Sequence, residues 1–273
     1  MTHPILERLH SAEPDVRADA CREALDDPSA LLLIDALGDA LGDPVDAVAL
    51  AASDALARLA REVDGVGRVL QRALRSDDAS RRWHAALTSA RIEPPAPRLL
   101  PAIVEALASP SRERRWTAAR LLVETGRMHP EVLKLALGLA TTSESARVRE
   151  MAIHCARELG ADVTEAADAL LAATRDRDRS VRRAALTALA ALEDPPCKVY
   201  AKLVDLLDDA SDGISRALAA RALCALARTA AREPPDAAIA ALRRLADADP
   251  DAELRAGAAR ALQSVARAAN AGE

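Results

Sequence analysis

One short pattern recurs along the chain, and this internal repeat constrains the fold more than any other feature of the sequence. The pattern is an apolar residue, an arginine, two variable residues and an alanine, and it is clearest at 16–20, 148–152, 181–185 and 254–258. Weaker copies lie at 81–85, 114–118 and 215–219, and the copy at 48–51 lacks the arginine. The shared alanines stand at positions 20, 51, 85, 118, 152, 185, 219 and 258. Their near-constant spacing indicates about eight units of one size.

Each unit has the pattern of a helical hairpin. In the segment that holds the alanine, apolar residues continue at helical spacing, as at Val181, Ala185 and Leu189. A short polar turn precedes this segment, and its Asp and Ser side chains can accept hydrogen bonds from the first free amides of the helix. Upstream of the turn the pattern predicts another amphipathic helix, for which the clearest segments are 66–74, 132–139, 163–173, 199–207 and 237–245. A single hairpin cannot bury its apolar face alone, so we expect neighbouring hairpins to stack.

Composition favours the same fold class. Half of the residues are apolar, yet the chain has no Phe, one Tyr and two Trp, so its interior must consist of Leu, Ala and Val. Alanine is the strongest helix former and lets helices approach closely, whereas sheets favour β-branched and aromatic residues. The sequence therefore predicts an all-α right-handed solenoid, an α-α superhelix of about eight hairpins, forming a single domain over residues 1–273.

The Asp-rich turn followed by Val-Arg-x-x-Ala resembles the HEAT repeat, in particular the short HEAT-like repeats of phycobilin lyases. The resemblance extends from about Glu13 to Leu262. It implies that the repeated arginine pairs with turn acids and holds neighbouring hairpins in register. The positions that carry this expectation are Arg17, Arg82, Arg115, Arg149, Arg182, Arg216 and Arg255. Tetratricopeptide repeats have a similar period, but they depend on aromatic positions that this chain does not supply.

The search for catalytic signatures is negative. The sequence contains no nucleophile elbow, phosphate loop, dinucleotide-binding fingerprint or His-Glu-x-x-His motif. No histidine is followed by Glu, which excludes the HEAT-repeat hydroxylase that binds iron through His-Glu pairs. The acids between Asp247 and Glu253 lack the glycine and the final carboxylate of a calcium loop, so we interpret them as helix caps. We expect no catalytic residue, no metal and no cofactor.

The cysteines and the apolar runs give no sign of a disulfide-stabilised or membrane-embedded protein. Cys21, Cys155, Cys197 and Cys224 have no metal-site or disulfide spacing, so we expect them to be small buried residues. The longest Leu/Ile run, 31–34, is too short to span a membrane, and no basic segment followed by an apolar run opens the sequence. We therefore expect a cytoplasmic protein without a membrane partner.

Two tryptophans mark the candidate binding site. Trp83 and Trp116 are 33 residues apart, each within the string Arg-Arg-Trp-x-Ala-Ala. Counted from the start of the second helix, the core takes positions near 0, 4, 7 or 8 and 11, which turns positions 2 and 6 toward the inner surface of a solenoid. Together with neighbouring arginines, these positions give the candidate partner-binding residues Arg81, Trp83, Arg114, Trp116, Arg120, His154 and Arg183.

Charge is concentrated in the same part of the chain. Residues 66–183 carry 21 basic and 15 acidic side chains, although the chain as a whole has a net charge of −5. Trp and Arg often dominate binding energy at interfaces. Our hypothesis is a protein-binding scaffold whose basic, aromatic groove on the concave face holds an acidic or extended partner segment. The alternative for the tryptophans is packing between adjacent repeats.

Two other function classes stay open. One is a nucleic-acid binder resembling the HEAT-like alkylpurine DNA glycosylases. The net negative charge and the few aromatic residues available to hold a flipped base argue against it. The other is a chromophore-handling role like that of phycobilin lyases, which only the repeat subtype suggests.

Overall fold

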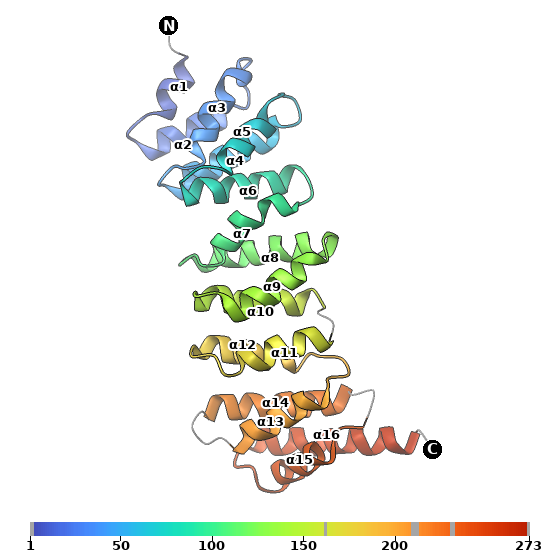
Figure 1. The fold of residues 1–273 in the computed structure, drawn as a ribbon. Coiled ribbons are helices and arrows are strands. Elements are labelled where there is room, and N and C mark those ends of the chain that lie inside the picture. The colour runs from blue at the N-terminus through green and yellow to red at the C-terminus, as the bar shows by residue number, and fades with distance from the viewer. Residues whose placement is uncertain (1–2, 161–162, 209–212, 230–232, 272–273) are drawn as a thin grey trace. The chain divides into compact units, whose positions relative to one another are not determined.

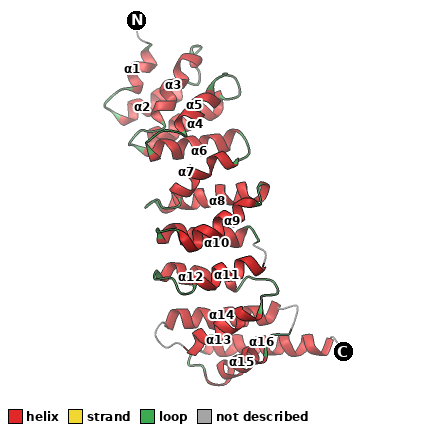
Figure 2. Cartoon of the chain, in the orientation of Figure 1, coloured by secondary structure: helices red, strands yellow, loops and turns green. Residues whose placement is uncertain are grey.

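Helices are the only regular elements that the described residues form (Figure 2). The computed structural model describes residues 3–160, 163–208, 213–229 and 233–271. The chain divides into two compact units, which we call the N-terminal unit (Met1–His129) and the C-terminal unit (Pro130–Glu273). Each unit consists of stacked helical hairpins (Figure 1). The all-α, solenoid-like repeat fold expected from the sequence is confirmed.

The N-terminal unit contains four hairpins. Their first helices are α1 (Pro4–Leu9), α3 (Ala30–Ala40), α5 (Val66–Ala73) and α7 (Leu100–Ala106), the last preceded by a 3-10 turn at Pro97–Leu99. Their second helices are α2 (Pro14–Glu23), α4 (Asp46–Leu59), α6 (Ala79–Ile92) and α8 (Arg112–Met128). Helix α1 lies upstream of the first repeat motif, where the pattern predicts the first helix of a hairpin.

Packing in this unit follows the repeat. Helices α2, α4 and α6 pack in series, as do α1, α3 and α5 (Figure 1). Leu33 and Leu37 of α3 and Leu56 of α4 are fully buried between them. Helices α3 and α5 approach so closely at Gly38 that a Cβ atom there would clash with Cγ1 of Val69. Any other residue at position 38 would therefore force the side chain of Val69 to move.

The C-terminal unit contains the other four hairpins. Their first helices are α9 (Glu131–Thr142), α11 (Val163–Ala173), α13 (Cys197–Asp208) and α15 (Asp236–Ala248). Their second helices are α10 (Ala146–Glu158), α12 (Arg179–Leu189), α14 (Gly213–Thr229) and α16 (Ala252–Ala271), and consecutive second helices pack against each other. Val181, Ala185 and Leu189 of α12 are fully buried, as their helical spacing predicted.

The polar turns start the second helices in the expected way. Asp78 accepts hydrogen bonds from the amides of Ser80 and Arg81, and Asp251 accepts one from the amide of Glu253. These side chains satisfy donors that have no partner within the helix. The interpretation of the acids near α16 as helix caps is thus supported by the geometry of Asp251.

One expectation about the cysteines is wrong. Cys21, Cys155 and Cys224 are buried, but Cys197 is exposed. Cys197 is the first residue of α13 and follows two prolines, so it lies at a helix end rather than on the apolar face of the helix. No helix in the described part of the chain is long and apolar enough to cross a membrane.

Candidate functional site

The repeated arginine joins two hairpins at once, and Arg149 shows this arrangement most completely. Its Nε and Nη2 donate hydrogen bonds to the two carboxylate oxygens of Asp176, at 2.7 and 2.8 Å. Its Nη1 donates to the carbonyl oxygens of Ser143 and Glu144, at 2.8 and 3.0 Å. One guanidinium on α10 thus binds the turn of its own hairpin and the turn of the next. We call such an arrangement a seam.

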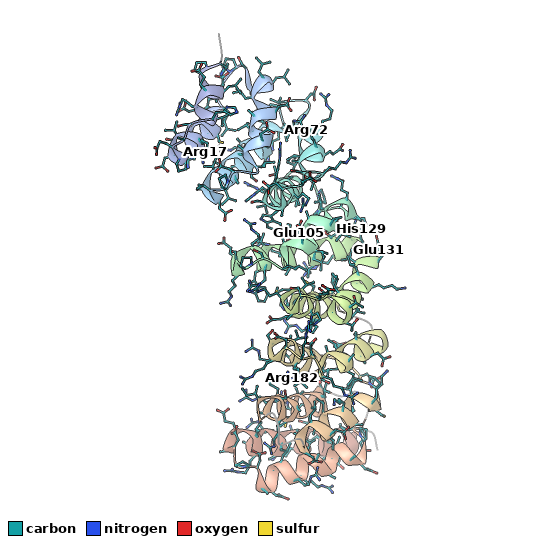
Figure 3. The ribbon with its side chains drawn as sticks, turned by 60° about the vertical axis from the view of Figure 1, so that its left-hand side comes forward. Arg17, Arg72, Glu105, His129, Glu131 and Arg182 are labelled. Carbon is teal, nitrogen blue, oxygen red and sulfur yellow. The ribbon has the colours of Figure 1, made fainter. Side chains whose placement is uncertain are left out.

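Related arrangements recur in both units. Arg17 donates to both carboxylate oxygens of Asp43, Arg82 to those of Glu105 on α7, and Arg216 donates one hydrogen bond to Asp249. Figure 3 labels Arg17 and Glu105 in the N-terminal unit and Arg182 in the C-terminal unit. Three further arginines donate to the carbonyl oxygens of their own turns, namely Arg115, Arg182 and Arg255. The planar, five-donor guanidinium suits this task, because it can serve a carboxylate and two carbonyls together.

The seams hold their acids in the ionised form. The hydrogen bonds from Arg149 keep the pKa of Asp176 below its ordinary value. Burial alone would raise the pKa of Asp43 and of Asp249, but hydrogen bonds from Arg17 and Arg216 and from nearby amides lower both. Charge-assisted hydrogen bonds of this kind are roughly twice as strong as those between neutral groups.

One junction in the N-terminal unit has no seam of this kind. The copy of the repeat on α4, at 48–51, lacks the arginine that would form a seam. Between the second and third hairpins, ion pairs join the helices instead: Arg72 with Asp35, Arg81 with Asp39 and Arg91 with Asp54. These carboxylates are 60 to 68% exposed. Exposed pairs contribute little and are screened by salt.

Trp83 lies in the core of the N-terminal unit. Its side chain is only 5% exposed on α6, so the indole packs between helices. The neighbouring His84 is also buried, and its Nδ1 donates to the carbonyl oxygen of Ser80 at 2.9 Å. Burial lowers the pKa of His84, and the positive charge of Arg114 lowers it further. The side chain of Trp83 therefore fills space between helices and is not exposed on a binding surface.

Trp116 has the opposite environment. It is 43% exposed on α8, and the exposed Arg120 follows one helical turn later. Arg81 and Arg114, also named as candidates, are each bound to a carboxylate, Arg81 to Asp39 and Arg114 to Asp46. Of the five candidates in this unit, Trp116 and Arg120 therefore present the most accessible aromatic and basic groups together.

The two remaining candidates belong to the C-terminal unit. His154 is partly buried on α10, where burial and the charge of Arg157 lower its pKa. Arg183 is exposed on α12. Helices α10 and α12 pack against each other, so both residues lie on consecutive second helices.

The basic excess is confined to two hairpins of the N-terminal unit. Residues 66–129 carry 12 basic and 6 acidic side chains, whereas 130–183 carry nine of each sign. Residues 1–65 carry 5 basic and 14 acidic side chains. Trp116 and Arg120 thus stand in the basic part of a unit whose first two hairpins are acidic. In the described residues, no three His, Cys, Asp or Glu side chains are grouped so that they could hold a metal ion.

Stacked hairpins joined by arginine seams define an α-helical repeat protein. Three overlapping stretches, 66–157, 100–190 and 140–224, match the family model described as HEAT repeats. Together they cover more than half of the sequence, and the chain belongs to the HEAT repeat family. No curated protein matches the chain.

Solved structures show the same fold. Kap121p bound to Nup53p is similar with a TM-score of 0.52 and 14% identity, over 97% of this chain and 37% of that one. The karyopherin Kap121p bound to the extreme C-terminus of the protein phosphatase Cdc14p gives a TM-score of 0.54 at 14% identity, over 97% and 38%. This chain therefore spans less than two fifths of the length of those proteins. At such low identity, the likeness concerns the fold alone.

Proposed function

We propose that this chain is a non-catalytic protein-binding scaffold, and that Trp116 and Arg120 on α8 form its contact with an acidic, extended partner segment. One observation carries the proposal. The chain has two tryptophans in the same repeat context, and one is buried while the other is 43% exposed. An exposed indole beside an exposed guanidinium has the composition of an interface hot spot.

The chemistry of the pair defines the partner. The indole face offers apolar area to an aliphatic or aromatic side chain, and the guanidinium of Arg120 offers paired donors to a carboxylate. The basic charge of residues 66–129 would attract an acidic segment and speed its association. A short segment with one apolar and one acidic side chain fits both groups.

The family supports a protein as the partner. Among the similar structures, Kap121p is seen bound to Nup53p, to Ste12p and to Pho4p. HEAT solenoids bind through extended surfaces formed by successive repeats. We extend the proposal to Arg81, Trp83 and Arg114 as supports of the α8 face, and to His154 and Arg183 as further contacts on the C-terminal unit.

Peptide display followed by titration tests the proposal. Peptides that bind the full chain are selected from a library of acidic segments, and their affinities are measured for Trp116→Ala. Loss of a hot-spot side chain costs 2 kcal/mol or more, so we expect affinity to fall about 30-fold or more. Met128→Ala is the matched control, because Met128 is also on α8 and 47% exposed. Equal affinities for the two variants would refute the α8 contact.

The other function classes are outcomes of the same experiment. If no peptide is selected and duplex DNA binds at low salt in a way that Trp116→Ala abolishes, the surface is a nucleic-acid interface. If absorbance titration with a bilin shows binding that depends on Trp116, the chain handles a chromophore. Either result replaces the protein-binding proposal.

A further inference from the structure

A second surface, in the C-terminal unit, has the features of a binding groove. It lies between α14 and α16, is open to solvent and has a volume of about 530 Å³. Of its lining residues, Cys224 is buried and Gly257 partly buried, and we call these the floor; the exposed Arg221, Arg228 and Arg260, with a single acid, Glu253, form the walls. Helices α14 and α16 pack directly against each other, so the groove follows their contact.

The arginines of this groove differ from those of the seams. In the part of the chain that the structure describes, no carboxylate lies within ion-pair distance of Arg228 or Arg260. Arg221 has only Glu253, at 3.7 Å, and Glu253 is 87% exposed. All three arginines are exposed, whereas the seam arginine Arg149 has a side chain only 6% exposed. The groove therefore presents cationic groups whose hydrogen bonds are available to a ligand.

The charges come from both walls. Burial raises the pKa of the Cys224 thiol, and the positive charges of Arg228 on α14 and Arg260 on α16 act against this rise. Two guanidinium groups on different helices thus lie near the same point of the floor. An anionic group placed there would receive hydrogen bonds from both sides.

The floor is shaped for the approach of a peptide backbone. A Cβ atom on Gly257 would lie 3.9 Å from Sγ of Cys224, so the glycine leaves space above the thiol. The neighbouring wall residue on α16 is Ala256, which adds only a methyl group. The backbone of a bound peptide can therefore approach the floor of the groove between the arginines.

We propose that this groove binds an extended acidic peptide in which two carboxylates are separated by two residues. Arg221 and Arg228 are seven residues apart on one helix, which places them about 10.5 Å apart along its axis. In a polyproline II segment, residues i and i+3 point to the same side and are about 9.3 Å apart. Acidic side chains at i and i+3 can therefore meet Arg221 and Arg228, while Arg260 reaches across from α16. This site does not rest on the proposed function of α8, since it shares no residue with it.

Fluorescence anisotropy with the full chain tests the site. The probe is a short fluorescein-labelled peptide centred on Glu-Pro-Pro-Glu, compared with the same peptide carrying Gln-Pro-Pro-Gln. We expect the Glu peptide to bind and the Gln peptide to bind at least about tenfold more weakly, because each charge-assisted bond contributes about a factor of ten. Arg228→Glu and Arg260→Glu should each weaken the Glu peptide about tenfold or more.

Two further variants separate a defined groove from general charge. Arg243→Glu on α15 is the matched control, because Arg243 is exposed in the same unit and lies outside the groove, and it should leave affinity unchanged. Gly257→Leu fills the floor without changing charge and should also weaken binding. Circular dichroism checks that each variant is folded.

Three outcomes would overturn the proposal. Equal loss of affinity in Arg243→Glu and Arg228→Glu would show an unspecific charge effect. Equal binding of the Glu and Gln peptides would show that carboxylates are not recognised. A single-stranded oligonucleotide that binds more tightly than the peptide and depends on Arg228 and Arg260 would make the groove a nucleic-acid site. In the same assay, Trp116→Ala should leave the affinity for the Glu peptide unchanged, because Trp116 does not line the groove.

Discussion

At the scale of the residue, identical local sequence leads to different environments. Trp83 and Trp116 share the string Arg-Arg-Trp-x-Ala-Ala, yet one is buried and the other exposed. A side chain on a helix surface is buried only if a neighbouring element covers it, and that neighbour is distant in sequence. The sequence could therefore predict the two candidates but not which of them is accessible.

The seam acids show the same limit. The acceptors Asp43, Asp176 and Asp249 lie 26, 27 and 33 residues after their arginines, and Glu105 lies 23 residues after Arg82. The repeat predicts that an arginine stands at each junction, because that position recurs. It does not predict the acid, because turn lengths and the lengths of first helices vary between repeats.

Protonation of His84 gives a prediction at this scale. Burial lowers the pKa of His84 in the folded state, while in the unfolded chain it has an ordinary value of about 6.5. As pH falls through that value, the unfolded chain takes up the proton first, so the stabilisation present above about pH 6.5 is lost. We expect the urea midpoint of the N-terminal unit, followed by tryptophan emission, to be lower at about pH 5.5 than at about pH 7.5.

The control for this effect is His84→Gln. An amide cannot ionise, so the difference between the two pH values should shrink in this variant. An unchanged difference would show that His84 does not cause the pH dependence.

At the scale of the element, the repeat predicts helices well and their contacts less well. Val181, Ala185 and Leu189 are buried because the helical period places them on one face of α12. The first helix of the first hairpin, Pro4–Leu9, lies upstream of the first polar turn, where the pattern predicts a helix, although it precedes the motif on which the repeat was recognised. How closely two helices approach depends on the side chains that meet at the crossing, as at Gly38 and Gly257.

These two glycines lead to opposite predictions for the same substitution. Gly38→Ala introduces a Cβ that clashes with Val69 in the core, and we expect a loss of about 1–3 kcal/mol in the free energy of unfolding. In Gly257→Ala, the new Cβ would contact only Sγ of Cys224, at 3.9 Å. The gain in helix propensity should therefore raise the free energy of unfolding by about 0.5–1 kcal/mol. Urea denaturation measures both changes. A gain for Gly38→Ala, or a loss for Gly257→Ala, would contradict the packing described for these crossings.

At the scale of the whole molecule, the stability of a repeat protein is nearly a sum over hairpins and their nearest-neighbour contacts. Both tryptophans belong to the N-terminal unit, so their emission follows that unit alone. Far-UV circular dichroism follows all helices. The two signals together can separate local from global unfolding.

The variant Arg149→Ala tests whether the two units unfold separately. Removing the guanidinium leaves Asp176, whose side chain is 11% exposed, without its partner, and should cost about 2–3 kcal/mol in the C-terminal unit. We expect the dichroism transition to shift to lower urea while the tryptophan transition stays in place. Arg183 is exposed on α12, and Arg183→Ala should shift neither transition by more than about 0.5 kcal/mol. An equal shift of both signals in Arg149→Ala would show that the chain unfolds as one cooperative body, as a single domain over residues 1–273 would.

A seam joins a hairpin to its immediate successor through one arginine and one acidic side chain, which lies in the next turn or, for Glu105, in the next first helix. A recombination event that removes or duplicates a whole hairpin brings another arginine opposite another turn, and the junction can form again. A cut between the turn and the arginine of one hairpin separates the guanidinium from the turn carbonyls that it binds. Lineages of such a gene are therefore expected to change length in steps of one hairpin, with breakpoints between hairpins rather than inside them.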